Sequence, residues 1–399
     1  MDYLIIGGGV AGISGAAAIR ELDKEGRITV LGDEPHPFYT RIRLPDFLAG
    51  RVTAEALLLK QEEWYRQQRI DLRLRQQVVA VDAGARTART AERTTFPYDR
   101  LLLATGGTSF LPPVPGIAKQ GVFTLRTLDD AIRIREYGHS ARQVAVVGGG
   151  VLGLEAGNGL LQAGCEITVV EFFDRLLPRQ TDPACSAMLQ EKLEAMGFCL
   201  VLAASVKEVM GEERVTGLLL ADGRQLACDM VIVAAGIRAN ALLAREMGLA
   251  VDKGVLVDDR MVTSQPEVFA AGDLVQHNGV TYGIWPAAQQ QGEVAGANMA
   301  GGDRCFTGMV PANLLKVAGI DLFAVGDIDA DGRHRPLSFR EPALHQYRKL
   351  VLDEEARPIG AILFGDLTHR RRVVAAIDRG EPVTATQQEA LRQGRFEML

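Results

Sequence analysis

The sequence of 399 residues has few cysteines, and none lies close to another. Iron–sulfur and zinc sites built from cysteine need clustered ligands, and the six histidines are scattered as well, so we expect no metal site. Scattered thiols are typical of a reducing compartment, which predicts a cytoplasmic protein. The cysteines are Cys165, Cys185, Cys199, Cys228 and Cys305, and the histidines are His36, His139, His277, His334, His345 and His369.

Long apolar runs and an excess of basic residues are also missing. No apolar stretch has the length that a bilayer requires, and the start MDYLIIGGG lacks the basic segment of a signal peptide. The net charge of −6 argues against a nucleic-acid partner. With 47% hydrophobic and 24% charged residues, the composition is that of a globular protein of two or three domains, with no membrane partner expected.

One glycine-rich phrase, by contrast, is present twice. Each copy follows a short apolar run, 4–6 or 144–147, that predicts a buried parallel strand. In the spacing G-x-G-x-x-G the first glycine permits a tight turn, the second lets the backbone approach a pyrophosphate, and the third lets the next helix pack on the strand. That helix presents unpaired N–H groups to the phosphates. The glycines are Gly7, Gly9 and Gly12 in the first copy, and Gly148, Gly150 and Gly153 in the second.

Each phrase is followed by a predicted strand that ends in an acidic residue. The stretch RITVLGDE ends at Asp33 and Glu34, and EITVVE ends at Glu171. A carboxylate at this point binds a ribose hydroxyl of a dinucleotide. The sequence therefore predicts two bound dinucleotides; two βαβ units without a ligand are the alternative.

The surroundings of Glu171 favour NADH over NADPH. A carboxylate there binds the free 2′-hydroxyl and repels a 2′-phosphate. Phe172 and Phe173 follow it, where a 2′-phosphate would require arginines. Arg175 and Arg179 lie close by in the sequence and leave NADPH open as the alternative.

Five segments stand in the order typical of one family. They are the two glycine phrases, LLLATGGTSFLPPVPG (101–116), VIVAAGIRAN (231–240) and VFAAGDLVQ (268–276). By these segments the chain resembles the pyridine nucleotide–disulfide oxidoreductase superfamily, which has two dinucleotide-binding domains. Ala239 departs from the pattern, which usually has proline there.

This resemblance implies the fold. We expect an α/β protein with two Rossmann-like domains of the glutathione-reductase type and a C-terminal α+β domain. The FAD-binding domain is expected over 1–108 and 238–308, the NADH-binding domain over 109–237, and the C-terminal domain over 309–399.

The same resemblance implies FAD at the first phrase and NADH at the second. Asp273 is expected at the ribityl chain of the flavin, with a helix N-cap as its alternative role. Val78 matches a backbone contact to adenine, and Arg126 matches an arginine near the flavin or is a surface arginine. A helix opening after Pro286 is expected to point its N-terminus at the flavin. The residues implied in cofactor binding are Gly7, Gly9, Val10, Ala11, Gly12, Asp33, Glu34, Arg41, Val78, Ala104, Thr105, Gly106, Arg126, Gly148, Gly150, Leu152, Gly153, Glu171, Gly236, Gly272, Asp273, Pro286 and Ala287.

Three residues are candidates for catalytic roles. Glu155 aligns with an acid that lies near the nicotinamide–flavin contact in similar proteins; a solvated helix glutamate is the alternative. Arg43, or Arg41, is a possible partner for it. Lys316 is expected to reach the flavin from the C-terminal domain, unless it is a surface cation on a strand edge.

The segment PFYTRIRLPDFLAG (37–50) contains no cysteine, whereas relatives that reduce disulfides or peroxides carry redox cysteines there. Electrons are therefore expected to leave the flavin directly. The segment is similar to that of NADH:rubredoxin reductases and of the NADH-binding part of nitrite reductases. Ferredoxin reductases usually have Leu-Ser-Lys where this chain has Leu44, Pro45 and Asp46. Residues 314–327 and 347–366 point to the same branch, and 347–366 predicts two strands around a turn at 353–358.

The sequence thus predicts an FAD-dependent NADH oxidoreductase whose acceptor is a small acidic redox protein of the rubredoxin type. The basic stretches THRRRVV (368–374) and DGRHRP (331–336) are candidates for its docking surface, or are solvated faces. Three alternatives stay open: an NADH oxidase, an electron-input subunit for nitrite reductase, and a redox-sensing interaction protein. A monomer or a homodimer is expected.

Overall fold

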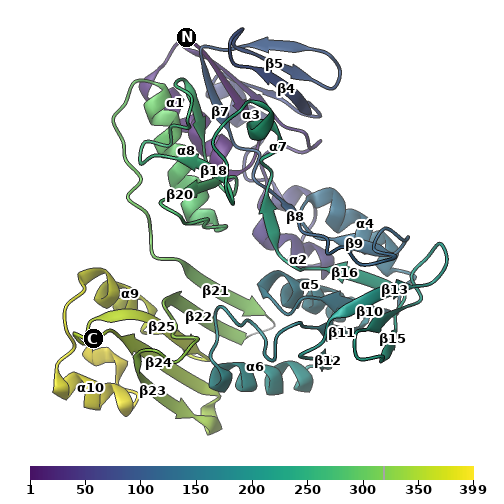
Figure 1. Cartoon of the computed structure of the whole chain (residues 1–399), viewed down its shortest axis with the longest axis vertical. Coiled ribbons are helices and arrows are strands. Elements are labelled where there is room, and N and C mark those ends of the chain that lie inside the picture. The colour runs from purple at the N-terminus through teal and green to yellow at the C-terminus, as the bar shows by residue number, and fades with distance from the viewer. Residues whose placement is uncertain (318–319) are drawn as a thin grey trace. The chain divides into compact units, whose positions relative to one another are not determined.

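In a computed structural model the chain forms two compact units, and each is described by itself (Figure 1). The structure describes residues 1–317 and 320–399, without the side chains of Asn313, Lys316 and Val317. The first unit comprises Met1–Arg43, Thr53–Phe110 and Ile237–Met309, and the second comprises Leu44–Val52, Leu111–Gly236 and Val310–Leu399. The limits given above for three domains stay a prediction.

The first unit is built on a five-stranded parallel sheet in the order β19-β7-β1-β2-β3. Side chains of β1 alternate between two cores. Ile5 lies in the core that contains α1 and α8 residues, whereas Leu4 and Ile6 lie in the other. Both faces are therefore covered, which explains the continuous apolar runs. The strands are β1 (Asp2–Ile6), β2 (Arg27–Leu31), β3 (Ile70–Arg73), β7 (Arg100–Leu103) and β19 (Val268–Ala270).

Helices α1 (Val10–Leu22) and α8 (Trp285–Met299) lie side by side in this unit (Figure 1). Glycines permit the close approach, because a Cβ at Gly292 would lie 2.2 Å from the carbonyl oxygen of Ala11, and one at Gly296 would lie 2.2 Å from that of Gly15. Helix α8 begins at Trp285, slightly before the start predicted at Pro286, and the proline occupies its first turn.

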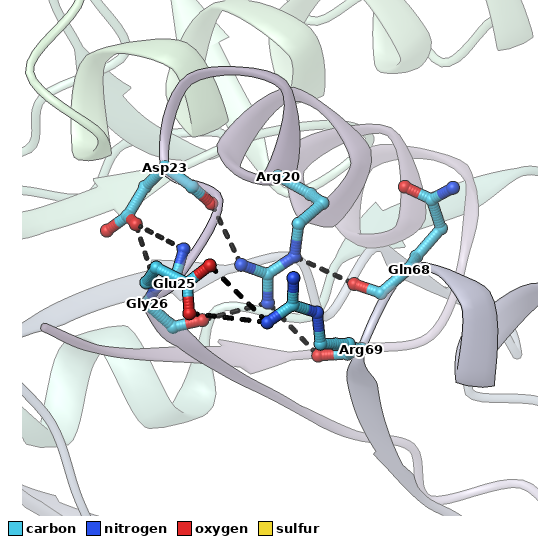
Figure 2. Close-up of polar contacts among 6 residues, drawn as sticks. All are labelled: Arg20, Asp23, Glu25, Gly26, Gln68 and Arg69. Carbon is cyan, nitrogen blue, oxygen red and sulfur yellow. Dashed lines mark hydrogen bonds and ion pairs between the residues drawn. The ribbon is translucent and has the colours of Figure 1, made fainter.

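A buried arginine stabilises the far end of the first βαβ unit (Figure 2). Arg20 is 7% exposed, and its guanidinium donates to the carbonyl oxygens of Asp23, Gly26, Gln68 and Arg69 at 2.7–3.0 Å. These bonds join the end of α1 to the turn before β3. They satisfy the charge with several dipoles, so no buried carboxylate is needed.

The rest of the first unit consists of short elements around this sheet. Strands β4, β5 and β6 form an antiparallel sheet, β8 pairs with β17, and β18 pairs with β20. Their bounds are β4 (Val78–Asp82), β5 (Thr87–Thr90), β6 (Thr95–Pro97), β8 (Gly107–Ser109), β17 (Ile237–Ala239), β18 (Val255–Val257), β20 (Val275–His277), α3 (Glu62–Gln67), α7 (Leu242–Glu246), η1 (Arg41–Arg43) and η2 (Glu55–Leu57).

The second unit contains another parallel sheet, in the order β12-β11-β10-β16-β9, and a small antiparallel sheet, β13-β14-β15. Thr127 and Asp130 form a capping box at α4, and Asp182 caps α6. The elements are α2 (Leu44–Leu48), β9 (Val122–Thr124), α4 (Leu128–Gly138), β10 (Gln143–Val147), α5 (Val151–Gln162), β11 (Glu166–Val170), α6 (Pro183–Ala195), β12 (Phe198–Val201), β13 (Val206–Met210), β14 (Gly217–Leu220), β15 (Gln225–Ala227) and β16 (Met230–Val233). The two parallel sheets confirm the α/β class with Rossmann-like domains.

Residues after 310 add an antiparallel sheet, β21-β22-β25-β24-β23, to the second unit. Strands β24 and β25 pair around the turn predicted at 353–358, so that prediction is confirmed. Helices α9 and α10 lie beside the sheet (Figure 1), and Val373 and Leu391 share a core with Leu350 and Leu363. No helix in the described residues is long and apolar enough to cross a membrane. The elements are β21 (Ala312–Val317), β22 (Ile320–Gly326), β23 (Arg335–Glu341), η3 (Pro342–Leu344), β24 (Gln346–Leu352), β25 (Pro358–Phe364), α9 (Arg370–Arg379), α10 (Ala385–Arg392) and η4 (Phe396–Met398).

Candidate functional site

The first glycine phrase forms the turn between β1 and α1. Gly7 has φ +118°, and a Cβ on it would lie 2.1 Å from the carbonyl oxygen of Ala104. A Cβ on Gly12 would lie 2.0 Å from the carbonyl oxygen of Gly7. The packing of the protein itself requires both glycines. At Gly9, by contrast, a Cβ would have no atom of the described residues within 4 Å, so the turn leaves space at the start of α1.

The second phrase repeats this geometry between β10 and α5. Gly148 has φ +115°, and its Cβ would lie 2.5 Å from the carbonyl oxygen of Ala234. A Cβ on Gly153 would lie 2.1 Å from the carbonyl oxygen of Gly148, whereas one on Gly150 would meet nothing within 4 Å in the described part of the chain. Neither α1 nor α5 has a side-chain cap at its N-cap glycine. Both helix starts therefore present N–H groups to open space, as an anion site requires.

The acidic residues after β2 differ in their surroundings. Glu34 accepts a hydrogen bond from the hydroxyl of Tyr39 and forms an ion pair of 2.5 Å with Arg41. Asp33 is exposed, and no hydrogen bond joins it to another described residue. Glu34 and Arg41, which were both predicted to bind a cofactor, thus bind each other in this structure. Asp33 is the acid that is open to a ligand.

The acid after β11 is Glu171, which is 6% exposed. Its Oε2 accepts from the backbone N–H of Gly149 at 2.5 Å, and its Oε1 accepts from that of Phe173 at 2.8 Å. These bonds fix the carboxylate beside the second glycine turn. A carboxylate accepts about four hydrogen bonds, so two sites are left for a ribose.

Three other segments complete the candidate site of the first unit. The hydroxyl of Thr105 donates to the carbonyl oxygen of Asn240 at 2.9 Å, between the segments that leave and re-enter this unit. Gly272 has φ +85°, and its N–H donates to Oε1 of Gln291 at 2.9 Å. Pro286 and Ala287 lie in the first turn of α8. No sequence pattern singles out Gln291, because it is the third of three consecutive glutamines.

Glu155 lies on α5, one turn after the start of the helix, in the second unit. Burial and the carboxylate of Asp46 raise the pKa of Glu155 to about 7. Asp46 lies on α2 and forms an ion pair of 2.5 Å with Arg51. The two helices touch closely, because a Cβ on Gly159 would lie 2.7 Å from the carbonyl oxygen of Pro45. Asp46 is a neighbour of Glu155 that the sequence analysis missed.

The remaining candidates are placed as follows. Val10 and Ala11 begin α1, and Leu152 lies in the first turn of α5. Val78 begins β4, and Arg126 precedes the N-cap of α4. Ala104 and Gly106 flank Thr105, Gly236 has φ +102°, and Asp273 follows Gly272. Arg43 ends η1 in the first unit, whereas Glu155 belongs to the second, so their pairing stays a prediction. Lys316 lies on β21, and its side chain falls outside the described part of the chain.

Comparison with known proteins explains the repeated turn. Residues 1–292 match the model of the pyridine nucleotide-disulphide oxidoreductase family, and residues 311–381 match the rubredoxin NAD+ reductase C-terminal domain. The chain belongs to the pyridine nucleotide-disulphide oxidoreductase family.

Individual members of this family are similar over almost the whole chain. Nitrite reductase [NAD(P)H] of Bacillus subtilis is 33% identical over 98% of this chain, which spans 49% of that protein. NADH oxidase of Methanocaldococcus jannaschii is 30% identical over 95% of this chain and 90% of that protein. The crystal structure of NADH:rubredoxin oxidoreductase from Clostridium acetobutylicum has a TM-score of 0.84 at 26% identity, and the match covers 98% of this chain and 99% of that one. The chain spans about half the length of the first of these relatives.

The family implies binding of FAD and NAD(H), and the residues present fit both groups. In the first unit, the space at Gly9 suits a pyrophosphate, and the Nε2 of Gln291 is a buried donor without a partner among the described residues. In the second unit, the space at Gly150 lies beside the carboxylate of Glu171. An open cradle, free helix N–H groups and a nearby acid are the features of a dinucleotide site.

The five cysteines provide no redox pair in the described structure. None forms a disulfide. Burial raises the pKa of the thiols of Cys165, Cys185 and Cys228, which keeps them protonated and unreactive. Cys199 and Cys305 are exposed, but they lie in different units.

Proposed function

We propose that the protein transfers electrons from NADH through bound FAD to a small electron-carrier protein. The observation that carries this proposal is the combination of two open dinucleotide turns with the lack of a cysteine pair. A family member without a thiol relay passes electrons from the flavin directly to its acceptor. FAD, when bound, supplies the ring that takes a hydride from NADH and releases electrons to a carrier.

The residues of each unit have separate tasks. The first glycine turn and Asp33 bind FAD, and Asp273 and the start of α8 hold its flavin end. The second glycine turn and Glu171 bind NADH and select it over NADPH. The hydride transfer needs no nucleophile from the protein, so the task of these residues is to position the two cofactors.

Glu155 supplies a group that changes its charge near neutral pH. Burial and Asp46 disfavour the charged form and raise the pKa of Glu155 to about 7, so its carboxyl is mostly protonated below this pH and mostly ionised above it. Arg43 and Lys316 are proposed to supply positive charge at the flavin, Arg43 as the partner of Glu155. A carboxyl with such a pKa beside a dinucleotide turn favours a role at the site over that of a solvated helix residue.

The acceptor that we propose is rubredoxin. The match of residues 311–381 to a rubredoxin reductase domain and the similarity to the clostridial enzyme support this choice. Arg370, Arg371 and Arg372 are exposed at the start of α9, where the helix dipole adds to their positive charge. This surface is complementary to a small acidic protein and would accelerate its docking.

A second candidate function is electron input to nitrite reductase. It is favoured by the Bacillus relative, in which the matching half of the protein is joined to further sequence. In this case the acceptor is a nitrite-reducing partner, and the tasks of the FAD and NADH residues are unchanged.

Anaerobic stopped-flow spectroscopy tests the proposal. The purified protein is loaded with FAD, reduced with NADH or NADPH, and mixed with rubredoxin, ferredoxin, a nitrite reductase lacking its NADH-binding part, or oxygen. Rapid reduction by NADH and rapid reoxidation by rubredoxin are expected. Faster reoxidation by the nitrite reductase supports the second candidate, and fastest reoxidation by oxygen indicates an NADH oxidase. A reduced flavin that no acceptor reoxidises contradicts electron transfer and indicates a redox sensor.

A further inference from the structure

Gln291 carries a buried amide of which only one half is used. Its side chain lies on α8 and the residue is 1% exposed. Oε1 accepts the hydrogen bond from the N–H of Gly272 at 2.9 Å. Nε2 has no hydrogen-bond partner among the described residues. Leaving a buried donor without a partner is costly, so a group outside the described chain is expected there.

Gln291 lies next to two segments that are expected to bind FAD. A Cβ on Gly272 would lie 3.0 Å from the Cβ of Ala11 and 3.8 Å from that of Ala288. A Cβ on Gly292 would lie 2.2 Å from the carbonyl oxygen of Ala11. Gln291 therefore lies beside the Gly272 turn, which itself packs against the first turn of α1. The open space at Gly9 begins at the same helix start.

We propose that Nε2 of Gln291 donates a hydrogen bond to an oxygen of the chain of FAD that runs from the diphosphate to the ribityl group. The inference rests on the proposed FAD-binding function of this unit. The amide then connects two partners: its oxygen holds the Gly272 turn, and its nitrogen holds the cofactor. An amide donor suits this position because it binds an anionic oxygen without adding a buried charge.

Two features of the arrangement favour the cofactor over a chance void. First, Oε1 is fixed by Gly272, so rotation of the amide would cost an existing bond and the direction of Nε2 is set. Second, the turn held by Gln291 immediately precedes Asp273, which we assign to the ribityl chain. Binding of FAD satisfies the donor without breaking the bond to Gly272.

Two substitutions separate the two halves of the amide. Gln291→Glu keeps an oxygen that accepts from Gly272 and replaces the donor with a second oxygen. Gln291→Met keeps the length of the side chain, stays neutral and removes both the donor and the oxygen that accepts from Gly272, so its comparison with Gln291→Glu isolates the bond to Gly272. Gln290→Glu and Gln290→Met are the matched controls, because Gln290 is the exposed neighbour on the same helix.

The readout is the dissociation constant for FAD, measured by titrating apoprotein and following the flavin fluorescence. Circular dichroism and thermal unfolding of each apoprotein verify the fold. Both Gln291 variants are expected to bind FAD at least about tenfold more weakly than the unmodified protein, and both Gln290 variants within about twofold of it.

An affinity of Gln291→Met within about twofold of that of the unmodified protein overturns the inference, because it shows that a water or a void accommodates Nε2. If Gln291→Glu does not fold, Gln291→Met decides: weaker FAD binding by an apoprotein that unfolds at the same temperature as the unmodified apoprotein supports the inference, and unchanged binding overturns it. Failure of the unmodified apoprotein to bind FAD is a different result, since it refutes the proposed function itself.

Discussion

Oε2 of Glu171 accepts a hydrogen bond of 2.5 Å from the backbone N–H of Gly149, the residue between the first two glycines of the second turn. The acid that we propose to select the coenzyme is thus held by the same turn that would hold its pyrophosphate. Phe173 supplies the second backbone donor, at 2.8 Å. The position of the carboxylate is set before any ligand binds, which reduces the ordering that binding requires.

Replacing Glu171 with alanine is expected to abolish the preference for NADH. A hydrogen bond from a ribose hydroxyl to a carboxylate contributes about 1.5–3 kcal/mol, so kcat/KM for NADH falls by roughly tenfold to hundredfold. The value for NADPH stays constant or rises, because the repulsion of its 2′-phosphate is lost. Steady-state kinetics with both coenzymes measures the ratio. Glu166→Ala, at the exposed start of the same strand, is the control, and an unchanged ratio in Glu171→Ala contradicts the assignment.

Glu155 predicts a pH dependence of stability. Its pKa in the folded protein is raised from the ordinary value of 4.5 to about 7, so the folded state keeps a proton that the unfolded chain has lost between these values. The free energy of unfolding therefore falls as the pH rises from 4.5 to 7 and is constant above, with a total loss of up to about 3 kcal/mol. Glu155→Gln removes this contribution. Urea unfolding at pH 5, 6, 7 and 8 is expected to show a smaller decline in the variant.

The exposed Glu191 on α6 provides the comparison for this measurement. Glu191→Gln should leave the pH profile as in the unmodified protein, because the side chain of Glu191 is exposed to solvent. Parallel profiles of Glu155→Gln and the unmodified protein would show that the carboxyl of Glu155 is as well solvated in the folded state as in the unfolded chain.

The turns that contain the glycine phrases were predictable because the contacts that require glycine in them are local. Gly7 and Gly12 are required by atoms of the same βαβ unit or the adjoining strand, and the spacing alone reports this. Gln291 was not predictable, since Gln289, Gln290 and Gln291 are identical in sequence and only the contact of α8 with α1 decides which one is buried. Side-chain contacts that depend on the packing of distant segments leave no periodic signal in the sequence.

Asp182 is a second example of what the sequence could not reveal. Its Oδ1 accepts from the N–H of Cys185 at 2.9 Å as the N-cap of α6, which is a local and recognisable role. Its Oδ2 accepts from the hydroxyl of Tyr347 at 2.5 Å and lies 3.2 Å from Nζ of Lys349. Both partners come from β24, more than 160 residues later. The buried contact of α6 with this strand is visible only in three dimensions.

Tyr347→Phe is expected to destabilise the second unit by about 1–2 kcal/mol, because the buried carboxylate of Asp182 loses a donor. Asp182→Asn retains the cap on α6 but removes the charge, so it isolates the contacts to Tyr347 and Lys349. Urea unfolding of both single variants and the double variant gives the coupling, which should exceed about 0.5 kcal/mol for groups in contact. Tyr137→Phe, whose hydroxyl accepts an exposed bond from Arg214, is the control and should change stability little. Additive effects at Tyr347 and Asp182 would contradict a direct bond.

The glycines of the second turn allow ligand binding to be separated from folding. Gly153→Ala places a Cβ 2.1 Å from the carbonyl oxygen of Gly148, so it must shift α5 away from β10 and lower the melting temperature of the protein. The Cβ of Gly150→Ala meets no atom of the described structure within 4 Å, and the extended backbone of this position accepts any residue, so the fold is expected to stay intact. The added methyl group occupies the space proposed for the pyrophosphate of NADH and should raise the Kd for NADH by about tenfold or more. Calorimetry of NADH binding and thermal unfolding together test this pair. A Gly150→Ala variant with unchanged affinity for NADH would show that the coenzyme does not enter this turn, whatever its effect on stability.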